Sequence, residues 1–391
     1  MTTKAITFLG AGPLKETTYR WHDQTCTTHL MAEATARMFG PTQLHVIVTK
    51  EARERHFADL VQRLDGVLPV VPVAIPSGQS EDDLWTIFAA IAGVIEDDDT
   101  IIFDITNAFR SLPVLALLAA AFVRVVRNAT VERIVYGAFE AQQDGITPIF
   151  DLTPFVDLFA WTTATDAFIK YGRADDLTPL VRAAASGGTA RTRLSGAADL
   201  LALADRLGTL TKALQSARPA EVMQTADGLG ALVDRVRPGA SAAASPFALL
   251  LDMIVAEYGS FGLANPEQSG AYDLLSRQLA MIDWYLKKGL AVQAITTARE
   301  WLVSLVVAED GGDIFAPTDR EEAERLLNNK PSATIPASHI PRLAELRKVW
   351  SSTSRPRNDV AHTGMRRGAR RAHVLLEAVT KVCEQLPGLL R

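Results

Sequence analysis

The chain has 391 residues, of which 48% are hydrophobic and 22% charged, and its formal net charge is −5 at neutral pH. This length exceeds what one ordinary core holds, and the composition is too apolar for a disordered protein, so two globular domains are expected. The negative charge argues against a protein that coats nucleic acid by bulk electrostatics, and the longest uncharged apolar run, residues 112–123, is too short for a membrane span.

The first part of the chain, to about residue 150, alternates short β-rich apolar runs with helical patterns. This order is typical of a parallel sheet with crossover helices, and strands that are apolar throughout suit a sheet covered on both faces. We therefore expect an α/β, Rossmann-like domain over residues 1–155. The expected strands are residues 4–12, 43–50, 68–75, 100–106 and 132–139, and the expected helices are 25–39, 51–64, 81–95 and 111–126.

The remainder of the chain loses the β signal, and Ala, Leu, Arg and Glu recur at helical spacing, as in residues 196–215 and 291–310. Gly, Ser and Pro predict loops at residues 185–196 and 236–246. We expect an all-α domain over residues 156–391.

The segment GAGPLKETTY, which follows the first expected strand, is one candidate ligand loop. Ligands of open parallel sheets bind at the carboxyl ends of the strands, and Gly10 and Gly12 permit a tight turn with close backbone approach. The dinucleotide fingerprint needs glycine where this chain has Lys15, which disfavours a dehydrogenase. A plain strand-to-helix turn is the alternative.

The segment DITNAFRSLP follows the strand expected at residues 100–106. Ser111 is a plausible N-cap and Pro113 is tolerated in the first helical turn, so a helix is expected to begin here. Its partial positive charge and Arg110 favour an anion such as phosphate. Asp104, Thr106 and Asn107 add carboxylate, hydroxyl and amide groups that can hydrogen-bond a base or a ribose. The alternative is a turn in which Arg110 pairs with Asp104.

These two segments, with residues 76–85 and 136–141, resemble the sensor domain of CRISPR-associated Rossmann-fold (CARF) proteins of type III CRISPR systems. The similar group carries an Asp-x-Thr-His-Gly-Phe-Arg-Ser motif, and this chain has Asn107 and Ala108 in place of His-Gly. The resemblance covers about 150 residues. It implies a dimer that binds cyclic oligoadenylate across its two-fold axis, with cyclic tetra-adenylate expected and the hexamer as alternative. The ligand-binding residues implied are Gly10, Gly12, Pro13, Leu14, Thr106, Asn107, Ala108, Phe109, Arg110 and Ser111.

A basic segment, residues 342–371, contains nine Lys and Arg residues against two acidic ones. Within it, Arg357, Asn358 and His362 form R-N-x-x-x-H, which resembles the catalytic motif of HEPN ribonucleases, helical nucleases that need no metal. Pro356 is expected to start a helix that Gly364 ends. A looser pattern joins Arg366 or Arg367 to His373, and a solvated basic helix face gives the same charge count.

Metal-independent RNA cleavage uses the neighbouring 2′-hydroxyl as nucleophile, so a proton-transfer group and a cation are needed. His362 can move protons near neutral pH, and Arg357 can hold phosphate oxygens, helped by a helix N-terminus. Asn358 would position the phosphate or orient the imidazole. Residues five apart on a regular helix point about 140° away from each other, so Arg357 and His362 do not share one narrow face. This arrangement suits a site that a second copy of the chain completes. Alternatively, His362 only hydrogen-bonds within an exposed turn.

Glu300, on a long apolar helix, would support the candidate catalytic site or form a partly buried ion pair with an arginine.

Together, these features predict a cytoplasmic homodimer, or a higher oligomer, that cleaves single-stranded RNA when cyclic oligoadenylate binds and leaves a 2′,3′-cyclic phosphate. We expect no metal and no cofactor beyond the activator, and no membrane partner. One alternative is a ring nuclease that degrades cyclic oligoadenylate with Thr106, Asn107 or Ser111. Another is a non-enzymatic sensor that binds a partner.

Overall fold

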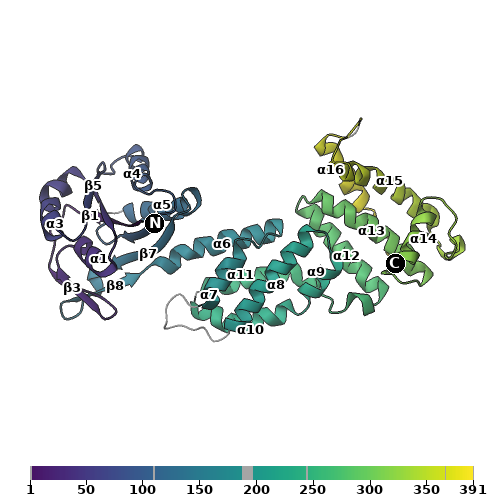
Figure 1. Ribbon diagram of the computed structural model, residues 1–391, viewed down its shortest axis with the longest axis horizontal. Helices are drawn as coiled ribbons and strands as arrows, with labels where there is room; N and C mark the ends of the chain where they lie inside the picture. The colour runs from purple at the N-terminus through teal and green to yellow at the C-terminus, as the bar shows by residue number, and fades with distance from the viewer. Residues whose placement is uncertain (1, 109–110, 187–196, 244, 366, 391) are drawn as a thin grey trace. The chain divides into compact units, whose positions relative to one another are not determined.

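The computed structural model describes residues 2–108, 111–186, 197–243, 245–365 and 367–390, and it leaves the side chains of residues 239–249 undescribed (Figure 1). The chain divides into two compact units, unit 1 (Met1–Ala160) and unit 2 (Trp161–Arg391). The boundary expected from sequence, between residues 155 and 156, falls inside helix α6 (Thr153–Tyr171).

Unit 1 is built on an eight-stranded sheet with the order β3-β2-β8-β7-β6-β1-β4-β5. The strands from β7 to β5 in this order are all parallel. β1 lies between β4 and β6, so the chain winds one way from β1 to β5 and the other way from β6 to β7. Open α/β sheets generally bind ligands at such a reversal, which here is the edge beyond β1 and β6. The parallel strands are β1 (Thr3–Leu9), β4 (Gln43–Val48), β5 (Val70–Ala74), β6 (Thr100–Asp104) and β7 (Thr130–Gly137).

The other side of the sheet carries strands that the sequence analysis did not predict, namely β2 (Thr17–Trp21), β3 (Gln24–Thr28) and β8 (Ile146–Asp151). β8 is antiparallel to β7, β2 pairs with β8 in parallel, and β3 is antiparallel to β2. The helix expected over residues 25–39 is therefore wrong in its first six residues, because the observed helix begins at Met31. The first four of them lie in β3, because a two-residue turn at His22, with φ of 52°, folds them back onto β2.

Helices cover both faces of this sheet. On one face α1 (Met31–Phe39) and α3 (Ala58–Arg63) pack on Ala5, Leu44 and Val46. On the other face, α4 (Glu81–Gly93) and α5 (Leu112–Val126) pack on strand side chains that point to that face, such as Ile6 of β1 and Phe103 of β6. The α/β class predicted for the N-terminal half is confirmed, with a mixed rather than wholly parallel sheet. Shorter elements are α2 (Lys50–Ala52), the π-helix η1 (Arg53–Phe57) and the 3₁₀ turn η2 (Phe139–Ala141).

Unit 2 is helical throughout its described residues, which confirms the all-α expectation. α13 lies at its centre, with the fully buried Trp301, and packs against α12, α14, α15 and α16. Together with Tyr258 and Tyr285, Trp301 is among the largest fully buried side chains of the unit. The helices are α7 (Leu177–Ser186), α8 (Ala197–Gln215), α9 (Pro219–Ala226), α10 (Leu229–Ala243), α11 (Ser245–Tyr258), α12 (Ala271–Lys287), α13 (Ala291–Asp310), α14 (Pro317–Leu327), α15 (Leu343–Ala361) and α16 (Ala372–Cys383), with 3₁₀ turns η3 (Gly259–Phe261), η4 (Pro266–Gln268), η5 (Ala337–His339) and η6 (Leu386–Leu389).

One loop prediction is wrong. Most of the loop expected at residues 236–246 is helical, because α10 continues through Pro238 to Ala243. Val236 is buried in the core, and Arg237 joins α10 to α11 through an ion pair with Asp252 at 2.5 Å, so tertiary contacts outweigh the missing amide hydrogen of proline. The loop expected at residues 185–196 lies almost wholly outside the described residues. No described helix is both long and apolar enough to span a bilayer.

Candidate ligand and catalytic sites

The segments that carry the ligand motifs meet at one edge of the unit 1 sheet. β5, β1, β6 and β7 are parallel, so the loops that follow them leave from the same side. The loops after β1 and β6 touch, since a Cβ built on Gly10 would lie 3.8 Å from the carbonyl oxygen of Asn107. Gly12 has open space around it. The fold therefore brings the glycine loop and the DITN segment together at the strand-order reversal, as the sequence predicts.

Asp104 lies beneath this edge and not at its surface. Its side chain is fully buried, its Oδ2 accepts a hydrogen bond of 2.6 Å from the hydroxyl of Thr7, and its Oδ1 accepts one of 2.9 Å from the amide of Thr106. Burial raises the pKa of the Asp104 carboxyl, against the opposing effect of these hydrogen bonds. Asp104 thus supports the loop from within the core. The expectation that its carboxylate hydrogen-bonds a base or a ribose is wrong, because the side chain is fully buried.

The DITN loop itself is partly exposed. Thr106, Asn107 and Ala108 are half-buried, and the Thr106 hydroxyl accepts a 2.8 Å hydrogen bond from the amide of Gly137, which fixes the loop to the end of β7. Ser111 occupies the N-cap position of α5 as predicted, but its hydroxyl makes no capping bond. Phe109 and Arg110 lie outside the described residues, and so does the proposed pair between Arg110 and Asp104.

Basic side chains that the sequence analysis did not assign to this edge hold the glycine loop. Arg55 donates a 2.7 Å hydrogen bond to the carbonyl of Ala11, and the Nε2 of His56 donates one of 3.0 Å to the carbonyl of Gly12. Both residues belong to η1, and π-helical turns are frequent at functional sites. The basic composition of residues 50–56 was visible in the sequence, but its position beside β1 depends on the strand order.

The helix that carries the R-N-x-x-x-H motif differs from the one expected. α15 begins at Leu343, and Pro356 lies inside it, buried against the core. His362 is the C-cap, and Gly364, with φ of 70°, ends the helix as predicted. The motif therefore lies at a helix C-terminus, whose partial charge is negative, so the argument that α15 itself attracts phosphate is wrong.

The N-terminus of another helix, α16, lies beside the motif and has a partial positive charge. Asp359 is buried, and its Oδ2 accepts a 3.1 Å hydrogen bond from the backbone amide of Arg370, which brings the start of α16 to the end of α15. Arg371 is the N-cap of α16, and no side chain caps the helix. Asp359, to which the sequence analysis assigned no role, thus holds Arg370, just before α16, beside the last turn of α15.

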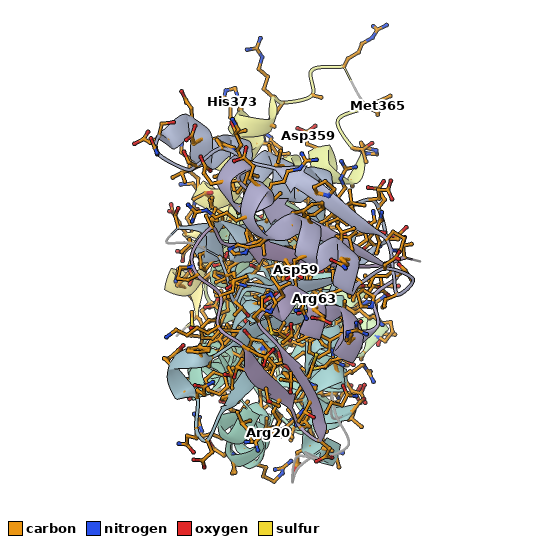
Figure 2. The ribbon with its side chains drawn as sticks, turned by 90° about the vertical axis from the view of Figure 1, so that its left-hand side faces the viewer. Arg20, Asp59, Arg63, Asp359, Met365 and His373 are labelled. Carbon is orange, nitrogen blue, oxygen red and sulfur yellow. The ribbon has the colours of Figure 1, made fainter. Side chains whose placement is uncertain are left out.

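The motif residues and their neighbours are accessible. Arg357 is half-buried, Asn358 and His362 are exposed, and Arg357 donates a 3.4 Å hydrogen bond to the Oδ1 of Asn358. The connecting loop and the start of α16 also face solvent, as Met365 and His373 show (Figure 2). Further cations add positive charge nearby: Arg355, Arg367 and Arg371 are exposed.

Other parts of the basic segment are structural. Arg342 pairs with Glu309 at 3.3 Å, and Arg347 donates to the carbonyl of Leu326 at 2.8 Å. Arg366, which forms one version of the looser motif, lies outside the described residues. A solvated basic face therefore accounts for only part of the segment's charge.

Glu300 takes part in an ion-pair network, which supports the alternative that the sequence left open. Its carboxylate pairs with Arg299 and, at 2.6 Å, with Arg320. Burial opposes its ionisation, but the two guanidinium groups hold its pKa below the usual value. Among the described residues, no group of three or more His, Cys, Asp or Glu side chains is arranged to hold a metal ion.

Comparison with known proteins gives one family and one curated relative. Residues 157–262 match the model of the second domain of CRISPR-associated protein MJ1674. The protein of that name from Methanocaldococcus jannaschii is 29% identical over 104 residues, which are 26% of this chain and 16% of the relative. The chain thus matches about a sixth of that protein's length. The predicted relationship to CRISPR-associated proteins is confirmed over this segment, which contains neither candidate site.

A solved structure also aligns with the chain. It is Csm6 of Enterococcus italicus bound to cyclic hexa-2′-fluoro-hexa-dAMP, and the alignment covers 100% of this chain and 94% of that one at 9% identity and a TM-score of 0.46.

Proposed function

We propose that this relative of CRISPR-associated proteins is an endoribonuclease of type III CRISPR defence that cyclic oligoadenylate activates and that needs no metal. Unit 1 is the CARF-type sensor, unit 2 contains the HEPN-type nuclease, and the working form is a cytoplasmic homodimer. The observation that carries the proposal is the accessible Arg357–Asn358–His362 group, which a buried Asp359 fastens beside the free N-terminus of α16.

The edge of unit 1 suits an anionic ring of nucleotides. Gly10 and Gly12 carry no side chain, and a Cβ built on Gly12 would meet no atom within 4 Å, so a phosphate can approach the backbone there. The uncapped start of α5 and the basic side chains Arg55 and His56 favour negative charge. Asn107 and Ser111 offer an amide and a hydroxyl for base or ribose.

Exposed apolar side chains on unit 1 support a homodimer. Val114, Leu118 and Val125 on α5 are 58%, 50% and 85% exposed, and Trp85 on α4 and Phe155 on α6 are 72% and 66% exposed. Exposed apolar clusters of this kind mark interaction surfaces in soluble proteins. A second copy would cover them and would place two ligand edges together, as a cyclic and therefore symmetric messenger requires.

The chemistry proposed for unit 2 is attack of the RNA 2′-hydroxyl on the adjacent phosphorus. His362 accepts the 2′-hydroxyl proton or donates one to the leaving 5′-oxygen, and Arg357 stabilises the charge that builds on the non-bridging oxygens. Asn358 holds the phosphate, and the N-terminus of α16 adds partial positive charge. The products are a 2′,3′-cyclic phosphate and a 5′-hydroxyl. Because one chain offers a single exposed imidazole in this motif, a second copy would supply the other proton-transfer group.

A fluorogenic single-stranded RNA assay in EDTA tests this proposal. Adding cyclic tetra-adenylate should raise the cleavage rate, and His362→Ala or Arg357→Ala should lower the activated rate by about 100-fold or more, as expected for removal of a proton-transfer or charge-stabilising group. His373→Ala is the matched control, because His373 is equally exposed at the start of α16, and it should keep the parental rate. Absence of activation by the tri-, tetra- and hexa-adenylate rings alike would refute the proposal.

The same reactions separate the two alternatives. Chromatography of the cyclic oligoadenylate after incubation detects a ring nuclease by the appearance of linear fragments. A non-enzymatic sensor would bind the ring while the RNA remained intact in every variant.

A further inference from the structure

A cavity of about 390 Å³ lies in unit 2, away from the motif of α15. Its walls come from α12, α13, the turn between α8 and α9 with the first residues of α9, and the residues that lead into α14 with Arg320 of that helix. This volume lies within the range of pockets that enclose small ligands, about 300–1,000 Å³. Leu274, Ile314 and the partly exposed ring of Phe315 form an apolar part of the wall.

The wall contributed by α13 is polar, although most of that helix is an apolar core element. Thr297, Glu300 and Ser304 are spaced by three and four residues and so share one face. Arg320 joins the last two, donating to Glu300 at 2.6 Å and to the Ser304 hydroxyl at 2.9 Å. Glu300, Ser304 and Arg320 are thus held together by hydrogen bonds.

Two further polar atoms of the wall have no such partner. Thr297 is only 3% exposed, and neither its hydroxyl nor the Oε1 of Gln278 has a hydrogen-bond partner within the described part of the chain. The Ser304 hydroxyl, about two turns further along the same face of α13, donates instead to the carbonyl of Glu300 at 2.9 Å. An unpaired buried polar group costs about 1–3 kcal/mol, so a cavity that retains two of them is suited to a ligand that completes their bonds.

The wall at the start of α9 favours an anion. Arg218 and Pro219 line the cavity where α9 begins, with Arg218 as the N-cap and no side chain bonding to the first amides. Arg218 is exposed and can turn toward the cavity mouth. An uncapped helix start beside a guanidinium group is a favourable place for a phosphate.

We propose that this cavity binds a nucleoside phosphate. The phosphate lies at the start of α9 with Arg218, the base packs against Phe315 and its apolar neighbours, and Gln278 and Thr297 hydrogen-bond the polar edge of the base or the ribose. The source is a free mononucleotide or the terminal nucleotide of an RNA chain. The proposal is independent of the nuclease activity, because it concerns a different set of residues.

Isothermal titration calorimetry on the full chain, without activator, tests the site with four nucleoside 5′-monophosphates, a 2′-O-methyl dinucleotide phosphate and inorganic phosphate alone. At least one nucleotide probe should bind, and inorganic phosphate should bind more weakly. Thr297→Val, which keeps the shape and removes the hydroxyl, should weaken nucleotide binding at least tenfold, as should Gln278→Leu. Binding of the dinucleotide only would identify a chain end as the ligand.

Thr211→Val is the matched control, since Thr211 on α8 is also 3% exposed with an unpaired hydroxyl but does not line the cavity. It should bind nucleotide like the parent. Both valine variants should fold with a melting temperature no lower than the parent's, because each removes an unpaired buried group. Failure of every nucleotide probe to bind, or equal binding by Thr297→Val and the parent, would overturn the proposal, whatever the outcome of the RNA cleavage assay.

Discussion

At the scale of single residues, Asp104 shows why a polar residue in a ligand motif need not touch the ligand. Its carboxylate is fully buried and holds Thr7 and Thr106, so its effect on the ligand edge passes through the DITN loop. The sequence places a carboxylate at the end of a strand, but whether it faces the core or the solvent depends on which neighbours cover it.

Asp104→Asn tests this burial through the pH dependence of stability. Burial raises the pKa of Asp104 in the folded chain above its unfolded value, so the parent loses stability as pH rises from the ordinary carboxyl pKa to the raised one, and no more beyond it. Asparagine keeps the shape and cannot ionise. The melting temperature of Asp104→Asn relative to the parent should therefore increase between pH 4 and pH 8, on the order of several degrees. A pH-independent difference would contradict a raised pKa.

Asp359 has a comparable role in unit 2. Asp359→Ala removes a buried acceptor from the amide of Arg370 and should lower the stability of the unit by about 1–3 kcal/mol, measured by urea unfolding. The rate of RNA cleavage should fall even under conditions in which the variant remains folded, because the loop between α15 and α16 would lose the hydrogen bond that holds it to Asp359. Glu345→Ala, an exposed change on the same helix, is the control and should alter neither quantity. Parental cleavage by a folded Asp359→Ala protein would rule out this role.

At the scale of elements, η1 is the part of unit 1 that links a basic segment to the glycine loop. Its Arg55 and His56 hold the carbonyl oxygens of Ala11 and Gly12 from the neighbouring strand connection. Nearby, the ion pair of Asp59 with Arg63 at 3.0 Å ties successive turns of α3 (Figure 2).

Arg55→Ala should weaken the binding of cyclic tetra-adenylate about tenfold, through the loss of one charge-assisted contact and a less ordered loop. Fluorescence anisotropy with a labelled ring measures this change. Arg53→Ala is the control: Arg53 is exposed on the same π-helix and lies over the ring of Phe57, so it should bind the ring like the parent. Equal binding by Arg55→Ala and the parent would remove η1 from the ligand edge.

Element prediction from the sequence succeeded where burial controls the pattern. The five parallel strands and the helices around them are runs of apolar residues whose type follows from period and length. β2, β3 and β8 were missed because polar residues, threonines above all, interrupt their apolar pattern, and because β2 joins the sheet only through β8, which is distant in sequence. Pro356 indicated a helix start, yet it is buried within α15, where packing of the preceding turn compensates for the missing amide.

At the scale of the whole molecule, the two units have separate cores. The buried residues of unit 2 form one cluster around α13, while those of unit 1 cluster on the faces of its sheet. Stability in one unit should therefore be separable from ligand binding in the other.

Trp301→Ala tests this separation. Removal of a fully buried tryptophan should cost unit 2 about 3–5 kcal/mol, seen as an earlier transition in urea unfolding followed by tryptophan fluorescence and circular dichroism. Unit 1 should still bind cyclic tetra-adenylate with the parental affinity. Loss of ring binding together with the unfolding of unit 2 would show that the units are not independent.

Only part of each candidate site could be predicted from the sequence. The motif residues were recognisable as short patterns, but Arg55, His56 and Asp359 act through contacts that only the strand order and the α15–α16 loop create. Each proposed site is thus held by a residue that its motif does not specify, through hydrogen bonds to the glycine loop in unit 1 and to the amide of Arg370 in unit 2.

The most direct measurement of the central claim is the cleavage rate of single-stranded RNA by the full chain in EDTA, with and without cyclic tetra-adenylate, for the parent and for His362→Ala. We expect the ring to activate the parent strongly and the variant to stay at its basal rate while binding the ring with unchanged affinity. A parental rate that the ring does not change, or a variant that the ring activates equally, would contradict the account.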